Sequence, residues 1–205
     1  MQLRLHLQGV GHKYRSRWLF RHLSLELKSG TSWAIIGPNG AGKSSLLSLI
    51  AGYSSPVEGS ISYYLDEKPV RVQQLSPYFF WQSPHVQPPV DFTVGDLLRD
   101  YQKQKAFNPS IFMSHMKGIS LSMRIYELSS GMRQRLLIAL VLSASTGLIL
   151  LDEPTAFLDA DHKAHIWGAL QQVIQHPEYL LLCATNDPEE AAFFPHSLYL
   201  PSYQS

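Results

Sequence analysis

The stretch Gly37–Ser44, GPNGAGKS, contains the residue types and spacing that bind a phosphate chain. It fits the pattern G-x-x-x-x-G-K-[ST], with an apolar run before it at 32–36 and a helix-like segment after it. The glycines let successive backbone N–H groups point at one anion, and the helix start adds a partial positive charge. Lys43 can reach the β- and γ-phosphates of a nucleotide, and the Ser44 hydroxyl can ligate Mg²⁺. The alternative is a glycine turn that matches by chance, which the flanking strand and helix disfavour.

A pair of carboxylates follows a second apolar run, in the segment LILLDEP at 148–154. Four apolar residues bring Asp152 to the end of a buried strand, where it can hold Mg²⁺ through water. Glu153 comes directly after it, and a carboxylate there can orient and deprotonate an attacking water. The alternative is that both residues cap the next segment. Because they occur together with the phosphate loop, we favour a role in nucleotide hydrolysis.

Length and composition limit the class of protein. The chain has 205 residues, which suggests one domain, and 17 basic against 16 acidic residues give a net charge of +1. This balance argues against binding nucleic acid through net charge. The only cysteine is Cys183, which excludes an internal disulfide and fits a reducing compartment. The most apolar window, 136–151, is interrupted by polar residues and is shorter than the roughly 20 residues of a membrane span.

Apolar patterning predicts which segments are strands and which are helices. The strands expected from alternating or apolar runs are 3–10, 23–28, 32–36, 60–65, 78–82, 147–152, 179–185 and 197–200. The helices expected from caps and spacing are 43–52, 93–104, one beginning at Asn108-Pro109, one running from 129 to 142, 160–175 and 187–193. The three prolines of 83–92 predict a loop.

The order of these elements predicts an α/β fold in a single domain over 1–205. Strands that alternate with helices imply parallel βα units. We therefore expect a P-loop NTPase core with a mostly parallel sheet, made from 1–82 and 143–205. The core includes an N-terminal antiparallel β subdomain, and an α-helical subdomain is inserted at about 83–142.

A third motif, LSSGMRQR at Leu128–Arg135, resembles the signature L-S-G-G-Q-x-Q-R of ATP-binding-cassette (ABC) transporter ATP-binding subunits. Ser130 and Met132 depart from that pattern at its third and fifth positions. Other residues follow the family order: Tyr14 precedes the phosphate loop, Gln82 ends the strand before the insertion, and Asp159 follows the carboxylate pair. The resemblance covers essentially the whole chain.

The resemblance implies an ATP site with Mg²⁺, shared between two head-to-tail subunits. ATP would be bound by Tyr14, Gly37, Pro38, Asn39, Gly40, Ala41, Gly42, Lys43, Ser44 and Ser45. Mg²⁺ would be held by Ser44, Gln82 and Asp152. The second subunit would present Ser129, Ser130, Gly131 and Met132 to the γ-phosphate, using a hydroxyl, a backbone N–H and the helix dipole.

Three of these assignments keep an alternative. Tyr14 would stack on adenine, or it is an ordinary exposed tyrosine in a β-turn. Gln82 would contact Mg²⁺ or the attacking water, or it is a polar strand end. Asp159 would organise the dimer interface, or it caps the helix at 160–175, and one side chain could do both.

Asn186 ends the strand LLLCAT at a position where the family usually has a histidine. An asparagine offers an N–H donor, but it is shorter by about one bond and does not titrate near neutral pH. Losing one preorganised donor to a transition state costs on the order of 10²–10³ in rate. With Glu153, Gln82 and Asn186 as catalytic residues, we expect normal ATP binding and slow hydrolysis.

The resemblance also implies partners and a location. We expect a second ABC ATPase subunit and an integral membrane permease subunit that docks beside Gln82, with no nucleic acid partner. The protein would be cytoplasmic and peripheral on the membrane through that permease. A non-transport cassette with coiled coils or two phosphate loops does not fit, and an unrelated P-loop kinase or GTPase would lack the LSSG helix. A slow or inactive half of a heterodimer, or a switch, stays open because of Asn186.

Overall fold

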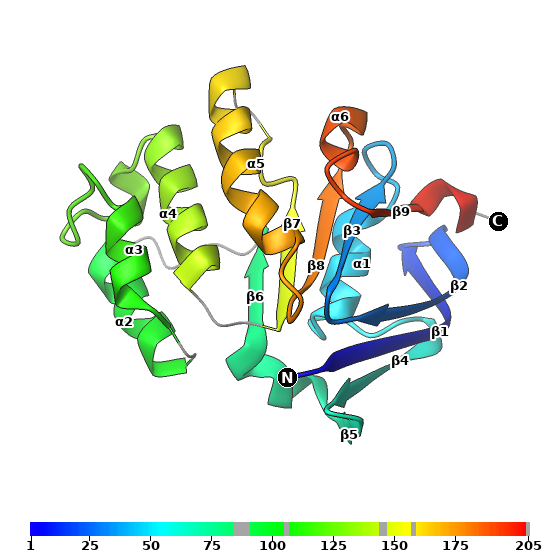
Figure 1. Cartoon of the computed structure of the whole chain (residues 1–205). Helices are drawn as coiled ribbons and strands as arrows, with labels where there is room; N and C mark the ends of the chain where they lie inside the picture. The colour runs from blue at the N-terminus through cyan, green and yellow to red at the C-terminus, as the bar shows by residue number, and fades with distance from the viewer. Residues whose placement is uncertain (84–90, 105–106, 144–146, 157–158, 204–205) are drawn as a thin grey trace.

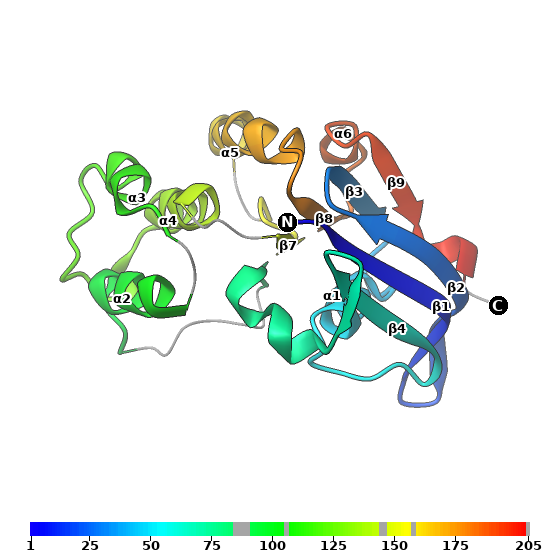
Figure 2. The same cartoon turned by 60° about the horizontal axis from the view of Figure 1, so that its bottom comes forward.

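The computed structural model describes residues 1–83, 91–104, 107–143, 147–156 and 159–203. It contains a parallel sheet with strand order β6-β7-β8-β3-β9 and an antiparallel sheet with order β2-β1-β4-β5. Figures 1 and 2 show the two sheets side by side, with helices α2, α3 and α4 grouped beyond β6 on the opposite side from the antiparallel sheet. The predicted α/β fold, with an antiparallel β part and a helical part, is confirmed. Most of the predicted loop at 83–92 lies outside the described residues.

The antiparallel sheet contains β1 (Leu3–Tyr14), β2 (Arg17–Lys28), β4 (Glu58–Leu65) and β5 (Lys68–Val70). The first two strands are longer than predicted. Pairing of β1 with β2 shifts in register between Leu7 and Val10 and again near His12, so bulges interrupt the alternation on which the prediction rested. The short edge strand β5 was not predicted, since its three residues include a proline.

The parallel sheet contains β3 (Thr31–Ile36), β6 (Phe79–Gln82), β7 (Leu148–Asp152), β8 (Leu180–Thr185) and β9 (His196–Tyr199). Every residue of β7 and β8 is buried, as expected for central strands covered on both faces. Pairing is in register along their whole lengths, so the carboxyl ends of β6, β7, β8 and β3 meet at one edge. That edge carries the candidate site.

The helices begin and end close to the predicted residues. They are α1 (Lys43–Ile50), α2 (Val94–Gln104), α3 (Pro109–His115), α4 (Ser130–Ser143), α5 (Ala160–Ile174) and α6 (Pro188–Ala191). Thr93 caps α2 by accepting from the Asp96 N–H at 3.1 Å, and Asn108 caps α3. Gly52, with φ 74°, follows the C-cap of α1. The 3₁₀ turns Val72–Tyr78, Ile125–Glu127 and Leu200–Tyr203 were not predicted.

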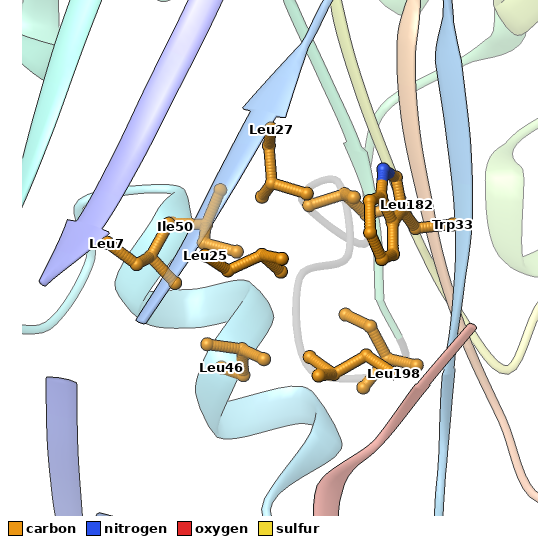
Figure 3. Close-up of a pocket in the computed structure, with 9 residues that line it drawn as sticks. Leu7, Leu25, Leu27, Trp33, Leu46, Ile50, Leu182 and Leu198 are labelled. Atoms are coloured by element: carbon orange, nitrogen blue, oxygen red, sulfur yellow. The ribbon is translucent and has the colours of Figure 1, made fainter. Parts of the chain in front are cut away.

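The parallel sheet supplies alternate side chains to two cores. Ile149, Leu151 and Leu181 face the core shared with α4 and α5, while Leu150 and Leu182 face the core shared with α1 and the antiparallel sheet. Figure 3 shows a small apolar cavity in the second core, with Leu7, Leu25, Trp33 and Leu198 among its lining residues. Its volume is about 10 Å³, room for one water at most, so the core is closely packed. Among the helices of the described residues, none has the length and apolarity to cross a membrane.

The bulge between β1 and β4 depends on a glycine. Gly59 has φ +74°, and a Cβ there would lie 2.2 Å from the Gln8 carbonyl oxygen and 2.4 Å from that of Gly9. Gly9 also has a positive φ, +59°, but a Cβ at that position would meet nothing within 4 Å.

We therefore expect Gly59→Ala to lower the free energy of unfolding by about 3 kcal/mol or more. Gly9→Ala, the matched control, carries only the left-handed backbone cost of about 1 kcal/mol. Urea denaturation of both variants measures the difference. Equal losses for the two variants would contradict the steric reading of Gly59.

Candidate functional site

The phosphate loop connects β3 to α1 and relies on glycine geometry. Gly40 has φ 79° and Gly42 has φ 99°. A Cβ at Gly42 would lie 3.0 Å from the Leu19 Cβ and 3.2 Å from the Phe20 ring, so both the backbone angle and the space require glycine. Ala41 is buried, whereas Pro38 and Asn39 are exposed. The loop therefore presents its backbone at the amino end of α1, where an anion is favoured.

Lys43 is nearly buried, with 5% of its surface exposed, and its ammonium lies under the loop. It donates to the carbonyl oxygens of Gly37 at 2.9 Å and Pro38 at 3.3 Å, and it lies 3.4 Å from Glu153 Oε1. These oxygens hold the positive charge at the centre of the site. A phosphate chain entering the loop would meet an ammonium that is already in place.

Asp152 is buried at the end of β7 and gathers three other polar groups. Ser44 Oγ donates to Asp152 Oδ1 at 3.0 Å, and Ser83 Oγ donates to Oδ2 at 3.1 Å. The Asp152 backbone N–H donates to Gln82 Oε1 at 3.3 Å. Ser83 was assigned to a loop by the sequence, although it directly follows Gln82 and its side chain is buried.

The donor set around Asp152 fits Mg²⁺, since the hydroxyl, carboxylate and amide oxygens of Ser44, Asp152 and Gln82 are hard ligands. In the described part of the chain, no group of three or more His, Cys, Asp or Glu side chains could hold a metal ion. An ion here therefore needs phosphate or water oxygens in addition to these three residues. Such a shared ligand set is usual for a nucleotide-bound Mg²⁺.

Glu153 adopts a left-handed backbone conformation, with φ 48°, which a non-glycine residue adopts only under constraint. Its N–H donates to the Ala184 carbonyl at 2.9 Å, which ties the turn after β7 to β8. About a third of its side chain is exposed, and it lines the cleft beside Lys43. The carboxylate is thus held at the mouth of the site, where water can reach it.

Asn186 lies at the end of β8, and its amide Nδ2 donates to Asn39 Oδ1 of the phosphate loop at 3.0 Å. The sequence places both residues at the site but does not predict the bond between them. The neighbouring Thr185, Asp187 and Glu190 form a polar network with Thr155 and Lys163. None of those five residues was predicted to take part, because their contacts join separate strands and helices.

A cleft of about 370 Å³ brings most of the predicted phosphate-loop residues together with Tyr14, Asp152 and Glu153, whereas Gln82 and Asn186 do not line it. It is lined by Tyr14, Leu19, Asn39, Gly40, Gly42, Lys43, Ser44, Ser45, Asp152 and Glu153. Tyr14 is the last residue of β1 and is 64% exposed at the rim, with the Arg15 guanidinium 5.6 Å from its ring centre. Leu19 was not predicted, and it gives the cleft an apolar lining residue.

The signature residues do not line this cleft. Ser129 caps α4, since the Met132 N–H donates to Ser129 Oγ at 3.3 Å. Ser129 and Ser130 are exposed, and Met132 packs against the helical core. Asp159 is exposed just before α5, and its carbonyl accepts from the Lys163 N–H at 3.0 Å. The two residues before Asp159 lie outside the described residues.

Comparison with known proteins identifies the family. The sequence profile described as ABC transporter matches residues 20–156. The chain belongs to the ABC transporter family. It is similar to the taurine import ATP-binding protein TauB of Yersinia pestis, with 31% identity over 204 residues, 97% of this chain and 79% of that protein. It is also similar to the molybdate import ATP-binding protein MolC of Haemophilus influenzae, with 28% identity over 215 residues, 100% of this chain and 81% of that protein.

Solved ABC structures share the fold. A dimeric ATP-binding cassette in a post-hydrolysis state, bound to ADP and phosphate, has a TM-score of 0.75 at 21% identity and covers 95% of this chain and 93% of that chain. A bacterial Atm1-family ABC exporter with ATP bound has a TM-score of 0.74 at 22% identity and covers 97% of this chain and 37% of that chain. The family and its relatives together make the chain an ATP-binding subunit of an ABC transporter.

Ser83 provides a test of the proposed Mg²⁺ site around Asp152 in this ABC subunit. Ser83→Ala removes the hydroxyl that donates to Asp152 Oδ2 and leaves a buried carboxylate oxygen one partner short. We expect the Mg²⁺ concentration for half-maximal ATPase activity to rise about 10-fold, as for other losses of outer-shell partners. ATP binding without Mg²⁺ should stay unchanged.

The matched control is Ser48→Ala, since Ser48 lies on the same helix as Ser44 but pairs with Ser54 at 3.2 Å, away from Asp152. Its Mg²⁺ dependence should equal that of the native protein. An unchanged Mg²⁺ dependence in Ser83→Ala would show that Ser83 does not support the Mg²⁺ site at Asp152.

Proposed function

We propose that the chain binds ATP with Mg²⁺ and hydrolyses it as one of two head-to-tail subunits, and that this drives an integral membrane permease. The observation that carries the proposal is the arrangement of Lys43, Ser44, Asp152 and Glu153 around one cleft at the carboxyl edge of the parallel sheet. The relatives named as import and export ATP-binding proteins support the transport role. Through the permease, the protein would lie at the cytoplasmic face of the membrane.

The phosphate chain would lie on the backbone of Gly37–Ser45, with Lys43 between the β- and γ-phosphates. Ser44, Gln82 and Asp152 would hold Mg²⁺, which supplies positive charge that polarises the phosphate oxygens when bound. Tyr14, at the rim of the cleft and 64% exposed, would stack on the adenine ring. Every residue in this account except Gln82 lies in the phosphate loop or lines the cleft.

Glu153 would orient and deprotonate the attacking water. Its turn is held by the bond to Ala184, and the ammonium of Lys43 lies 3.4 Å from its Oε1. Asn186 would donate to the γ-phosphate from the opposite side. One of its two amide protons is engaged by Asn39, so at most one is left for the phosphate. We therefore infer that this site hydrolyses ATP slowly.

Replacing Asn186 by histidine tests the slow site. We expect Asn186→His to raise the single-turnover ATPase rate by 10-fold or more, since a preorganised donor to the transition state is worth on the order of 10²–10³. Glu153→Gln should reduce the rate to the background set by Lys43→Ala. Rapid quench at saturating ATP gives all four rate constants.

ATP affinity should be the same in the native protein and Asn186→His, because the substitution acts on the transition state. An Asn186→His rate equal to the native rate would disprove the impaired-site hypothesis. The native single-turnover rate could instead equal the Lys43→Ala background while the protein still binds ATP and pairs. That result would favour the second candidate function, a silent or switch-like half of a heterodimer. Asn186 is the observation that favours this candidate.

Ser129, Ser130, Gly131 and Met132 would complete the site of the other subunit. They lie at the start of α4, outside the cleft of their own chain, and the two serines are exposed. A γ-phosphate arriving there would accept from the Ser129 hydroxyl and the Gly131 N–H at the positive end of the helix. Asp159, exposed before α5, would lie in the same interface.

ATP-dependent pairing gives a direct test of this geometry. In the Glu153→Gln background we expect a monomer without nucleotide and a dimer with ATP, by analytical ultracentrifugation. Adding Ser129→Glu should abolish the dimer, because a carboxylate would face the γ-phosphate. Ser110→Glu is the control, since Ser110 is also an exposed serine in a first helical turn. A dimer that survives Ser129→Glu would contradict binding in trans.

A further inference from the structure

Glu190 is a buried carboxylate to which the proposed function gives no role. It lies on α6, four positions after Asn186, and is only 5% exposed. Its two oxygens accept from two buried hydroxyls: Thr185 Oγ1 donates to Oε2 at 2.6 Å, and Thr155 Oγ1 donates to Oε1. Lys163 of α5 completes the set with its ammonium 3.2 Å from Oε1. The Glu190 side chain thus joins the end of β8, the turn after β7 and helix α5.

The same contacts fix the chain on both sides of Asn186. Thr185 precedes Asn186, and its hydroxyl oxygen accepts from the Asp187 N–H at 3.0 Å. Asp187 follows Asn186, caps α6 through the Glu189 N–H at 2.9 Å, and faces Lys163 at 3.2 Å. Hydrogen bonds to Glu190 and Asp187 raise the pKa of Lys163, so the ammonium stays charged. Asn186 is therefore supported from both neighbours.

Through its Oε1, Glu190 contacts the turn that carries Glu153, the carboxylate proposed to orient water. Thr155 comes two residues after Glu153, and it is 1% exposed. The backbone of Glu153 is in the left-handed conformation, which persists only where the surrounding structure holds it. The Glu153 N–H is bonded to Ala184 on one side, and the Thr155 hydroxyl is bonded to Glu190 on the other.

We propose that Glu190 is a positioning residue that holds the turns of Glu153 and Asn186 in fixed relation across the γ-phosphate site. The proposal rests on the proposed function, since it concerns hydrolysis at this cleft. Glu190 does not line the cleft, so it acts through the two turns and not on the substrate. Leaving a buried carboxylate oxygen without one of its donors costs free energy. We therefore expect the network to respond as a unit, so that both turns shift when one contact is lost.

Isosteric variants test the network without disturbing the volume of the core. Thr155→Val and Thr185→Val each remove one hydroxyl that donates to Glu190, and Thr155→Ser and Thr185→Ser restore it. Glu190→Gln removes the charge. The matched control is Ser32→Ala, because Ser32 is also 1% exposed and donates to the Ile174 carbonyl at 2.8 Å, at the amino end of β3.

Single-turnover ATP hydrolysis by the full chain is the first readout. We expect both valine variants and Glu190→Gln to lower the maximal rate about 10- to 100-fold, since small misplacement of reacting groups costs rates of that order. The ATP concentration for half-maximal rate should not change, and the serine variants should stay within about 2-fold of native. Ser32→Ala should hydrolyse ATP at the native rate.

Hydrogen–deuterium exchange of the peptide 184–190 is the second readout. It should become faster in the two valine variants and Glu190→Gln, and not in Ser32→Ala. The proposal is overturned if exchange does not change, if the maximal rates equal that of Ser32→Ala, or if the half-maximal ATP concentration rises as much as the rate falls. A native single-turnover rate equal to that of Lys43→Ala would overturn the proposed hydrolysis, and the positioning role of Glu190 with it. If the native rate lies above the Lys43→Ala background and the valine variants match it, the positioning role alone would be overturned.

Discussion

In-register parallel pairing of β6, β7, β8 and β3 is the constraint on which the site depends. It sets Gln82 opposite Leu151, Asp152 opposite Ala184 and Ile36 opposite Thr185. The carboxyl ends of parallel strands meet at one edge, so chain segments more than a hundred residues apart end within hydrogen-bonding distance. The bond between Asn186 and Asn39, 147 positions apart, is one result. A slip of one residue would turn every side chain of a strand to the other face and dismantle the cluster.

Two lysines organise the charges at that edge. Lys43 lies beside Glu153 and two loop carbonyls, and Lys163 lies between Asp187 and Glu190. Lys43 and Glu190 are the buried members of these pairs, and a buried charge persists only when it is paired and hydrogen-bonded. The first cluster faces the cleft and the second lies behind it. Between them runs the strained turn of Glu153, which belongs to both.

The two cores place the phosphate loop and the signature in different parts of the molecule. One face of the parallel sheet packs on the antiparallel sheet and α1, which carry the phosphate loop and Tyr14. The other face packs on α4 and α5, and α4 presents the signature residues elsewhere on the surface. The cleft is lined by β1, β2, the phosphate loop with α1, and the end of β7, and the signature residues at the start of α4 do not line it. This arrangement supports a site completed by a second subunit.

The sequence alone determined the residues that carry local chemistry. The phosphate loop, the Asp152–Glu153 pair, the caps at Thr93 and Asn108 and the α/β order are all legible there, because turn glycines, caps and hydrophobic periods are local signals. The bulged ends of β1 and β2 were missed, since a bulge shifts the alternation that marks a strand.

Only the tertiary structure decided which distant groups touch. Ser83 on Asp152, Asn186 on Asn39, and Glu190 between Thr155, Thr185 and Lys163 all join separate elements. Such contacts leave no period or spacing in the chain, because they depend on strand register and helix packing and not on neighbouring residues. The sequence therefore predicted Asn186 as a site residue, and the fold determined which groups hold it in place.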